Sequence, residues 1–347
     1  MRHILEHFQI RGVVTSIELF GSGHIHTTYE VVTTKAHYLL QKINDSVFNE
    51  VAAMMLNIYK VTNYLSVSFP KLGYDNQETL RLVETLKGQY FVQVTEGYFR
   101  MFDFKSNLKS FDIPTSDDQV FEGAKSYGYF LKALGEFEPA ELAITIPDFH
   151  NLAHRLDQFN LALSKLKHVP SHEAAHEMKM VNELADRLLP IWYLHSQEKV
   201  PIRVTHNDTK FNNVLLDGSN RGRCVIDLDT VMPGIVHYDF GDGIRSTAST
   251  AKEDESDLQL VNLDRERYHA FKAGYMEGAA DILKDEEKAF LSLSGAYMAF
   301  IMGLRFLTDF ISGNIYYRID YPHHNLDRCR NQFRLTHEIL AQRKDLK

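Results

Sequence analysis

One short stretch of the chain gathers side chains that suit phosphoryl transfer. In "VTHNDTKFNNVLLD" (204–217), Asp208 follows His206 by two places, and Asn213 lies just ahead of an apolar run. Asn and Asp favour loops, because they hydrogen-bond their own backbone, so a capped turn would explain any one of these residues. The combination of a histidine, a carboxylate and an amide at this spacing is harder to explain by turn formation alone.

A second stretch, "CVIDLD" (224–229), supplies further oxygen ligands. On a strand, Asp227 and Asp229 would share one face, opposite the apolar residues, and the loop that holds Asp208 and Asn213 could reach them. Carboxylate and carboxamide oxygens suit Mg²⁺, which keeps water and substrate phosphate in its shell. The pattern therefore predicts phosphoryl transfer, with Asp208 accepting the proton of the acceptor hydroxyl.

Composition limits the partners and the compartment. The chain has 347 residues, 44% hydrophobic content and a net charge of −8, which argues against a nucleic-acid partner. Two cysteines are too few for a disulfide framework, and we expect no signal peptide and no membrane span. We therefore expect a cytoplasmic protein that acts on small molecules, with no obligatory protein partner evident.

The chain divides into a strand-rich part and a helix-rich part. Strand signals appear at 13–20, 28–34, 37–44, 79–85 and 90–104, with one helix at 47–65. Helical signals follow at 116–137, 148–167, 172–198, 256–283, 285–312 and 325–343. A β-hairpin at 214–229 interrupts them. The sequence predicts an α+β fold, with a sheet-rich N-lobe over 1–104 and a mostly helical C-lobe over 105–347.

The two motifs resemble those of the kinase-like small-molecule phosphotransferases, which include aminoglycoside phosphotransferases and choline kinases. His206, Asp208 and Asn213 match their H-x-D-x-x-x-x-N loop, and "VIDLD" matches their metal-binding strand. The resemblance implies a two-lobed kinase-like fold, ATP as phosphoryl donor and Mg²⁺ as cofactor. It also implies that Asp208 is the catalytic base and that Asn213 and Asp227 hold the magnesium ion.

The resemblance extends to two further segments. "DFG" occurs at 239–241, beyond the hairpin, so we expect Asp239 to brace the catalytic loop rather than to bind metal. In the N-lobe, "LFGSGHIHTTYEV" resembles the loop that covers the nucleotide phosphates, and Lys42 occupies the place of the phosphate-pairing lysine. A solvated strand-end lysine is the alternative for Lys42, and Glu50 is a candidate ion-pair partner.

Longer stretches resemble the N-acetylhexosamine 1-kinases. These are "GSGHIHTTY", "YLLQKIN", "RVTHNDTKFNNVLLD", "CVIDLDTVMPG", "YDFGDGIR" and "GLRFLTDFISGNIYY", which together span nearly the whole chain. The resemblance implies phosphorylation of a free N-acetylhexosamine (GlcNAc or GalNAc) at its anomeric hydroxyl. It places His24, Arg305 and Tyr316 in the sugar pocket, together with Asp208.

The residues around Arg305 support this role independently. Arg305 lies in "AYMAFIMGLRFLTDF", an almost wholly apolar helical stretch, and a charge buried there needs a partner or a polar ligand. Asp309, four residues later, is the structural alternative, although Arg before Asp is the less favourable order along a helix. Tyr316 could stack on a sugar face or fill the core.

Three other functions remain open at this point. A different small-molecule kinase would take another sugar, an aminoglycoside or an amino alcohol, and the acidic run at 251–268 could attract a polycation. A non-catalytic nucleotide-binding module would lack a base or a metal ligand, and none is missing. A metal-dependent glycosyltransferase would use Asp227 and Asp229, but it leaves Asp208 and Asn213 without a role.

Overall fold

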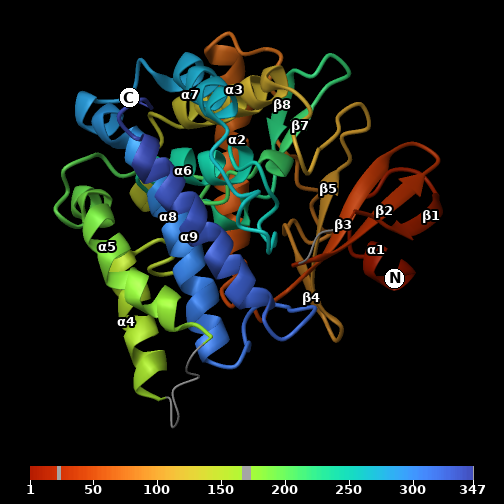
Figure 1. Cartoon of the computed structure of the whole chain (residues 1–347). Helices are drawn as coiled ribbons and strands as arrows, with labels where there is room; N and C mark the ends of the chain where they lie inside the picture. Colours follow the sequence, from red (N-terminus) through yellow and green to blue (C-terminus); the bar gives the residue numbers. More distant parts are fainter. Residues whose placement is uncertain (22–24, 166–172, 347) are drawn as a thin grey trace.

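The computed structural model describes residues 1–21, 25–165 and 173–346, and it begins with an antiparallel sheet. Its strand order is β1-β2-β3-β5-β4. The strands are β1 (Val14–Leu19), β2 (Thr27–Thr33), β3 (His37–Ile43), β4 (Val92–Val94) and β5 (Gly97–Asp103). Figure 1 shows this sheet on one side of the molecule, with the later helices on the other. The predicted sheet-rich N-lobe is confirmed.

The two faces of the sheet pack against different partners. Tyr38 and Leu40 of β3 point to the outer face, where they join a small core with residues of the N-terminal segment that begins with α1 (Arg2–Leu5). Ile43 points to the inner face and joins the main core of the molecule. Because side chains alternate along a strand, the inner face of β3 also carries Gln41.

The rest of the chain is mostly helical, as predicted. Its helices are α2 (Val51–Lys71), α3 (Asp117–Ala133), α4 (Leu152–Ser164), α5 (Ala175–Ser196), α6 (Val236–Thr247), α7 (Arg265–Ala279), α8 (Asp285–Ile311) and α9 (His324–Gln342). Short 3₁₀ turns lie at Pro139–Glu141, Phe211–Asn213 and Leu228–Thr230. Helices α8 and α9 run side by side, and the N terminus lies with the sheet (Figure 1).

Two short antiparallel pairs position the candidate site between the sheet and the helices. Strand β6 (Arg203–Thr205) pairs with β9 (Met232–Gly234), and β7 (Val214–Leu216) pairs with β8 (Gly222–Val225). The loop after β6 and the turn after β8 are therefore held next to each other. The predicted hairpin is confirmed, but its second strand ends at Val225, before the two aspartates.

Two expectations about the elements were wrong, and one helix was not predicted. Residues 79–85 form no strand and contribute only isolated bridges to neighbouring segments. The helix expected at 256–283 begins at Arg265, where Asp264 caps it by accepting a hydrogen bond from the Arg267 N–H at 3.1 Å. Helix α6 was not predicted, and it contains Gly241 and Gly243, a residue type that disfavours helix formation.

Packing explains the glycines of α6. A Cβ at Gly241 would lie 2.3 Å from the backbone oxygen of Ser294 in α8, and one at Gly243 would lie 2.1 Å from the Phe271 ring. The two glycines let α6 lie against α7 and α8 at once. Close tertiary packing thus outweighs the low helix propensity.

Helix α8 is the main core helix of the described part of the chain. It alone, among the helices described, is long and apolar enough to cross a bilayer, and most of its apolar stretch is buried inside the protein. Its composition is thus that of a helix surrounded by other helices.

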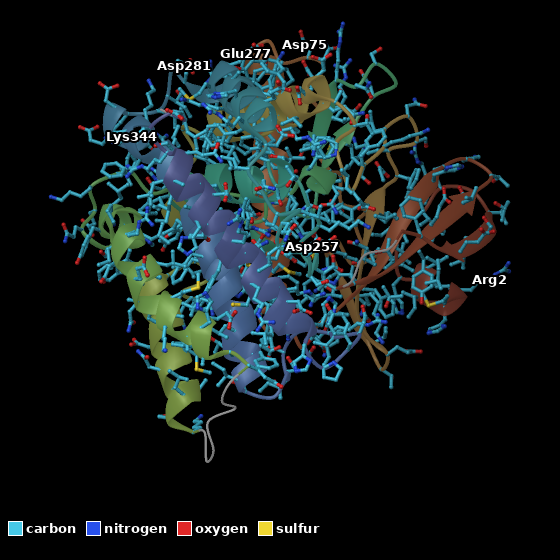
Figure 2. The ribbon with its side chains drawn as sticks, viewed as in Figure 1. Arg2, Asp75, Asp257, Glu277, Asp281 and Lys344 are labelled. Atoms are coloured by element: carbon cyan, nitrogen blue, oxygen red, sulfur yellow. The ribbon has the colours of Figure 1, made fainter. Side chains whose placement is uncertain are left out.

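Helices α3 and α7 pack closely because glycines line their contact. A Cβ at Gly274 of α7 would lie 2.1 Å from the backbone oxygen of Phe121 in α3. At the surface, Glu277 and Asp281 pair with lysines of α3, and both lie on the outer edge of the molecule (Figure 2). The backbone contact therefore leaves no room for a side chain at Gly274.

We predict that Gly274→Ala destabilises the protein, because overpacking against a backbone atom costs about 1–3 kcal/mol. The higher helix propensity of alanine returns only about 1 kcal/mol. Denaturant unfolding of Gly274→Ala beside His269→Ala, an exposed site on α7, measures the difference. A Gly274→Ala variant as stable as the natural protein would contradict the close contact.

Candidate active site

Asp239 holds the loop that carries Asp208. Its carboxylate accepts the N–H of His206 at 2.9 Å and the N–H of Asn207 at 2.7 Å. Asn207 has a φ of 65°, so the loop turns sharply just before Asp208. The prediction that Asp239 braces the catalytic loop is confirmed, and it does so from the first turn of α6.

His206 connects this loop to the turn that holds Asp227. Its Nε2–H donates to the Ile226 carbonyl at 2.8 Å, and its Nδ1 accepts the Asp208 N–H at 3.2 Å. The buried ring also packs edge-on against Tyr127. Both ring nitrogens are therefore used in positioning the site.

Asp208 lies between a lysine and an amide. Lys210 Nζ is 3.0 Å from Asp208 Oδ2, and Asn213 Nδ2 donates to the same oxygen at 3.2 Å and to the Asp208 carbonyl at 2.9 Å. Burial alone would raise the pKa of Asp208, but the surrounding groups, Lys210 foremost among them, together outweigh burial and lower that pKa. The Asp208 carboxylate is therefore ionised, and Lys210 and Asn213 fix its orientation.

Lys210 was not selected from the sequence. The negative charge of Asp208 raises the pKa of Lys210, with a smaller contribution from Asp227. The lysine is therefore a fixed positive charge beside both carboxylates. Its position two residues after Asp208 is the sequence signal that could have identified it.

Asp227 differs from its neighbours because no described residue donates a hydrogen bond to it or forms an ion pair with it. Its φ is 60°, in the left-handed region. Burial, together with the negative charges of Asp229 and Asp208, raises the pKa of Asp227 to about 6. A carboxylate that is held among other carboxylates and has no ion pair of its own is suited to receive a metal cation.

The donor set fits magnesium. Asn213 uses its amide nitrogen on Asp208, which leaves its side-chain oxygen without a donor among the residues that the structure describes. Within those residues, no three His, Cys, Asp or Glu side chains could enclose a metal by themselves. Mg²⁺ is usually held by one or two carboxylates together with phosphate and water, so Asn213 and Asp227 suffice as protein ligands.

Asp227 and Asp229 do not lie on a strand, contrary to the prediction that the two share a strand face. Strand alternation does not apply, because β8 ends at Val225 and residues Leu228–Thr230 form a 3₁₀ turn. Both Asp229 oxygens bind the Arg100 guanidinium of β5, and its Nη2 lies 2.9 Å from Oδ2. This ion pair is buried and joins the sheet to the segment that holds Asp227.

Two further side chains complete the Asp229 ion pair. Gln41 of β3 accepts a hydrogen bond from Arg100 Nε at 2.9 Å. His26 Nδ1 accepts the Asn44 N–H at 3.1 Å, which leaves its Nε2–H to donate to Asp229. The positive charge of Arg100 and the His26 hydrogen bond outweigh burial, so the pKa of Asp229 is lowered.

The structure does not bring Lys42 to this cluster. Lys42 is exposed on the face of β3 opposite Gln41, and among the described residues it has no ion pair with Glu50 or any other carboxylate. The cation that reaches the aspartates from the sheet is Arg100, and the nucleotide role of Lys42 stays a prediction. His24 lies outside the described residues.

Arg305 lies between two aromatic rings. Its guanidinium carbon is 5.2 Å from the centre of the Phe149 ring and 5.6 Å from that of Tyr317. It is not paired with Asp309, because Asp309 accepts the N–H groups of Ile315, Tyr316 and Tyr317 at 2.8–3.0 Å. The alternative of a helical Arg305–Asp309 pair is therefore wrong, and Asp309 instead fixes the loop of Tyr316, which is 63% exposed.

One short segment links Arg305 to the catalytic loop. His150 Nε2–H donates to the Asn207 carbonyl at 3.0 Å, and its ring lies 4.2 Å from that of Phe149. His150 is buried, and burial lowers its pKa to about 3, so the ring is neutral. Arg305 and Asp208 thus belong to one continuous region, with Phe149 and His150 between them.

We predict that Arg100→Met and Asp229→Asn each destabilise the protein by about 3–5 kcal/mol, because each leaves a buried partner uncompensated. The double variant should lose less than the sum of the two. Thermal unfolding of the two single variants, the double variant and the natural protein completes a double-mutant cycle. Strict additivity would mean that the two side chains stabilise the protein independently.

Comparisons with known proteins agree with this geometry. Residues 16–273 match the Phosphotransferase enzyme family (APH). An aminoglycoside phosphotransferase from Alicyclobacillus acidocaldarius superposes with a TM-score of 0.63 at 12% identity, over 100% of this chain and 95% of its own. A microcompartment-associated aminopropanol kinase superposes with a TM-score of 0.66 at 16% identity, over 99% of this chain and 97% of its own. Spectinomycin phosphotransferase, in complex with ADP and spectinomycin, superposes with a TM-score of 0.60 at 13% identity, over 99% of this chain and 97% of its own.

At these identities, the solved structures establish the fold. They confirm the predicted kinase-like fold with an antiparallel sheet in the N-lobe and a helical C-lobe. The family match spans most of the chain and includes Asp208, Asn213 and Asp227. The chain is therefore a member of the phosphotransferase enzyme family and a small-molecule kinase with a hydroxyl acceptor.

Proposed function

We propose that this protein transfers the terminal phosphoryl group of ATP to the anomeric hydroxyl of a free N-acetylhexosamine. The product is the sugar 1-phosphate. The observation that carries the choice of a sugar is Arg305, a guanidinium that lies between aromatic rings and has no carboxylate partner among the described residues. Its N–H groups can donate to ring and acyl oxygens, while the exposed Tyr316 offers an aromatic face.

The proton in this reaction goes to Asp208. An anomeric hydroxyl is more acidic than the other sugar hydroxyls, so a carboxylate of lowered pKa can accept its proton late in a loose transition state. The N–H groups of Lys210 and Asn213 hold the carboxylate in one orientation before the acceptor arrives. Asp208 therefore acts mainly as an orienting group and proton acceptor.

Asn213 and Asp227 would hold Mg²⁺, which supplies neutralisation of the phosphate charge when it is bound. Lys210 contributes a fixed positive charge next to Asp208 and Asp227. Asp229 does not take part as a ligand in this proposal, because Arg100 and His26 already engage its oxygens. ATP as the donor is supported by the ADP bound to spectinomycin phosphotransferase, which shares the fold.

A second candidate keeps the same reaction with another small acceptor. The relatives include an aminopropanol kinase and two aminoglycoside-type phosphotransferases, so an amino alcohol, an aminoglycoside or a different sugar would use the same base and metal ligands. A non-catalytic nucleotide-binding role is disfavoured, because the base and both metal ligands are present. The acceptor is therefore the point to test.

We predict that a coupled ADP-release assay gives the highest kcat/KM with GlcNAc or GalNAc in a panel that includes glucose, choline, ethanolamine and kanamycin. The product should be non-reducing, stable to alkali and labile to mild acid. Phosphorus–proton coupling in the NMR spectrum should place the phosphate on the first carbon. Phosphate on the sixth carbon, or preference for an amino alcohol, would exclude the hexosamine 1-kinase assignment and leave the second candidate.

The same panel tests the role of Arg305. Replacement by Leu suits the apolar helix, so Arg305→Leu should fold and should raise the sugar KM far more than the ATP KM. Equal changes in both values would indicate that Arg305 has a structural role.

We predict that Asp208→Asn lowers kcat by about 10²-fold or more, the usual scale for loss of a general base. Asparagine keeps the size of the side chain but cannot accept the proton. ATP binding, followed by calorimetry, should persist, because Asn213 and Asp227 are unchanged. Asp217→Asn, at the turn of the hairpin that follows the catalytic loop, is the matched control and should turn over normally. Normal turnover by Asp208→Asn would show that Asp208 is not the base.

A further inference from the structure

A second arginine lies beside Arg305 and has no part in the mechanism above. Arg155 of α4 donates from Nη2 and Nε to the Phe149 carbonyl at 2.7 and 3.2 Å, and from Nη1 to Gln158 at 2.8 Å. All its partners are neutral. Arg305 stacks on the ring of the same Phe149, so the two guanidinium groups share one short segment.

The positive charge of this pair is not neutralised nearby. Among the described residues, neither Arg155 nor Arg305 has a carboxylate within ion-pair distance. Asp148 is half exposed and its carboxylate lies 3.9 Å from Nδ1 of His154, while Glu253 is bound by Arg245 at 2.6 Å. Burial and the charge of Arg305 lower the pKa of Arg155 to about 10, so the Arg155 guanidinium is still charged at neutral pH.

Polar groups without partners surround the same place. The Tyr317 hydroxyl and His150 Nδ1 are buried and have no hydrogen-bond partner within the described part of the chain. The ring of Tyr317 contacts Arg305, and His150 donates to the catalytic loop through its other nitrogen. Buried polar groups are ordinarily satisfied, so these atoms indicate a space that water or a polar ligand occupies.

We propose that Arg155, together with Arg305, makes the acceptor pocket select against positively charged acceptors, so that an N-acylated amino sugar is used in preference to the same sugar with a free ammonium group. This inference rests on the proposed function and deepens it by naming a specificity-determining residue. A protonated amine beside two uncompensated guanidinium groups is repelled. An acetamido group is neutral, and its oxygen accepts hydrogen bonds from the same donors.

Glucose and glucosamine measure this effect, because they differ at one position by a hydroxyl against an ammonium group. In the natural protein at neutral pH, kcat/KM for glucose should exceed that for glucosamine. In Arg155→Gln, we expect this ratio to fall about fivefold or more, which corresponds to about 1 kcal/mol. Arg155→Lys keeps the charge and should keep most of the discrimination.

Arg187→Gln is the matched control, because Arg187 is exposed on α5, outside the residues placed in the site. It makes the same change of net charge and should leave the ratio unchanged. An unchanged ratio in Arg155→Gln would overturn the inference. A ratio relaxed equally in Arg155→Lys and Arg155→Gln would also overturn it, because geometry rather than charge would then be responsible.

The natural protein alone provides a further measurement, which holds even if the variants fold poorly. As pH rises, the amine of glucosamine loses its proton, so the kcat/KM for glucosamine divided by that for glucose should increase. The ratio is used because titration of the protein itself affects both sugars. A constant relative value would contradict repulsion. If no sugar is phosphorylated, the proposed function itself fails, whereas phosphorylation of GlcNAc with an unaltered ratio overturns only the role of Arg155.

Discussion

The buried ion pair between Arg100 and Asp229 is the interaction on which the site depends. It joins a strand of the N-terminal sheet to the turn that follows β8, and both side chains are almost fully buried. Removing two charges from water costs several kcal/mol per ion, and only good geometry with further hydrogen bonds offsets that cost. Gln41 and His26 provide those bonds, so the sheet is held in one place against the catalytic segment.

This pair also explains why two aspartates in one short turn behave differently. Asp229 accepts hydrogen bonds from Arg100 and His26, and its pKa is lowered. Asp227, two residues earlier, receives none from the described residues, and its pKa is raised to about 6 by burial and by its acidic neighbours. In this turn, the aspartate whose charge is stabilised joins the sheet to the turn, and the aspartate whose charge is destabilised is the candidate metal ligand.

The sequence predicted the parts of the site that depend on local spacing. Asp208 and Asn213 lie on one loop, and a hairpin carries the chain from them to Asp227, so their proximity follows from a few consecutive residues. The Arg100–Asp229 pair joins positions 129 residues apart, and the spacing of residues in the sequence does not predict such a contact. Alternation along the end of β8 also failed, because Asp227 adopts a left-handed conformation that ends the strand.

The contrast between local spacing and long-range contacts also applies to the reaction type and the choice of acceptor. The proposed base and metal ligands were identified from motif spacing, so phosphoryl transfer could be predicted without the structure. The proposed acceptor site combines the segment before α4, the end of α8 and the loop that Asp309 fixes, and its electrostatic character depends on which charges lack partners there. In a fold shared at 12–16% identity, these long-range contacts can change while the motifs remain, so the electrostatics of this region carry the information on substrate.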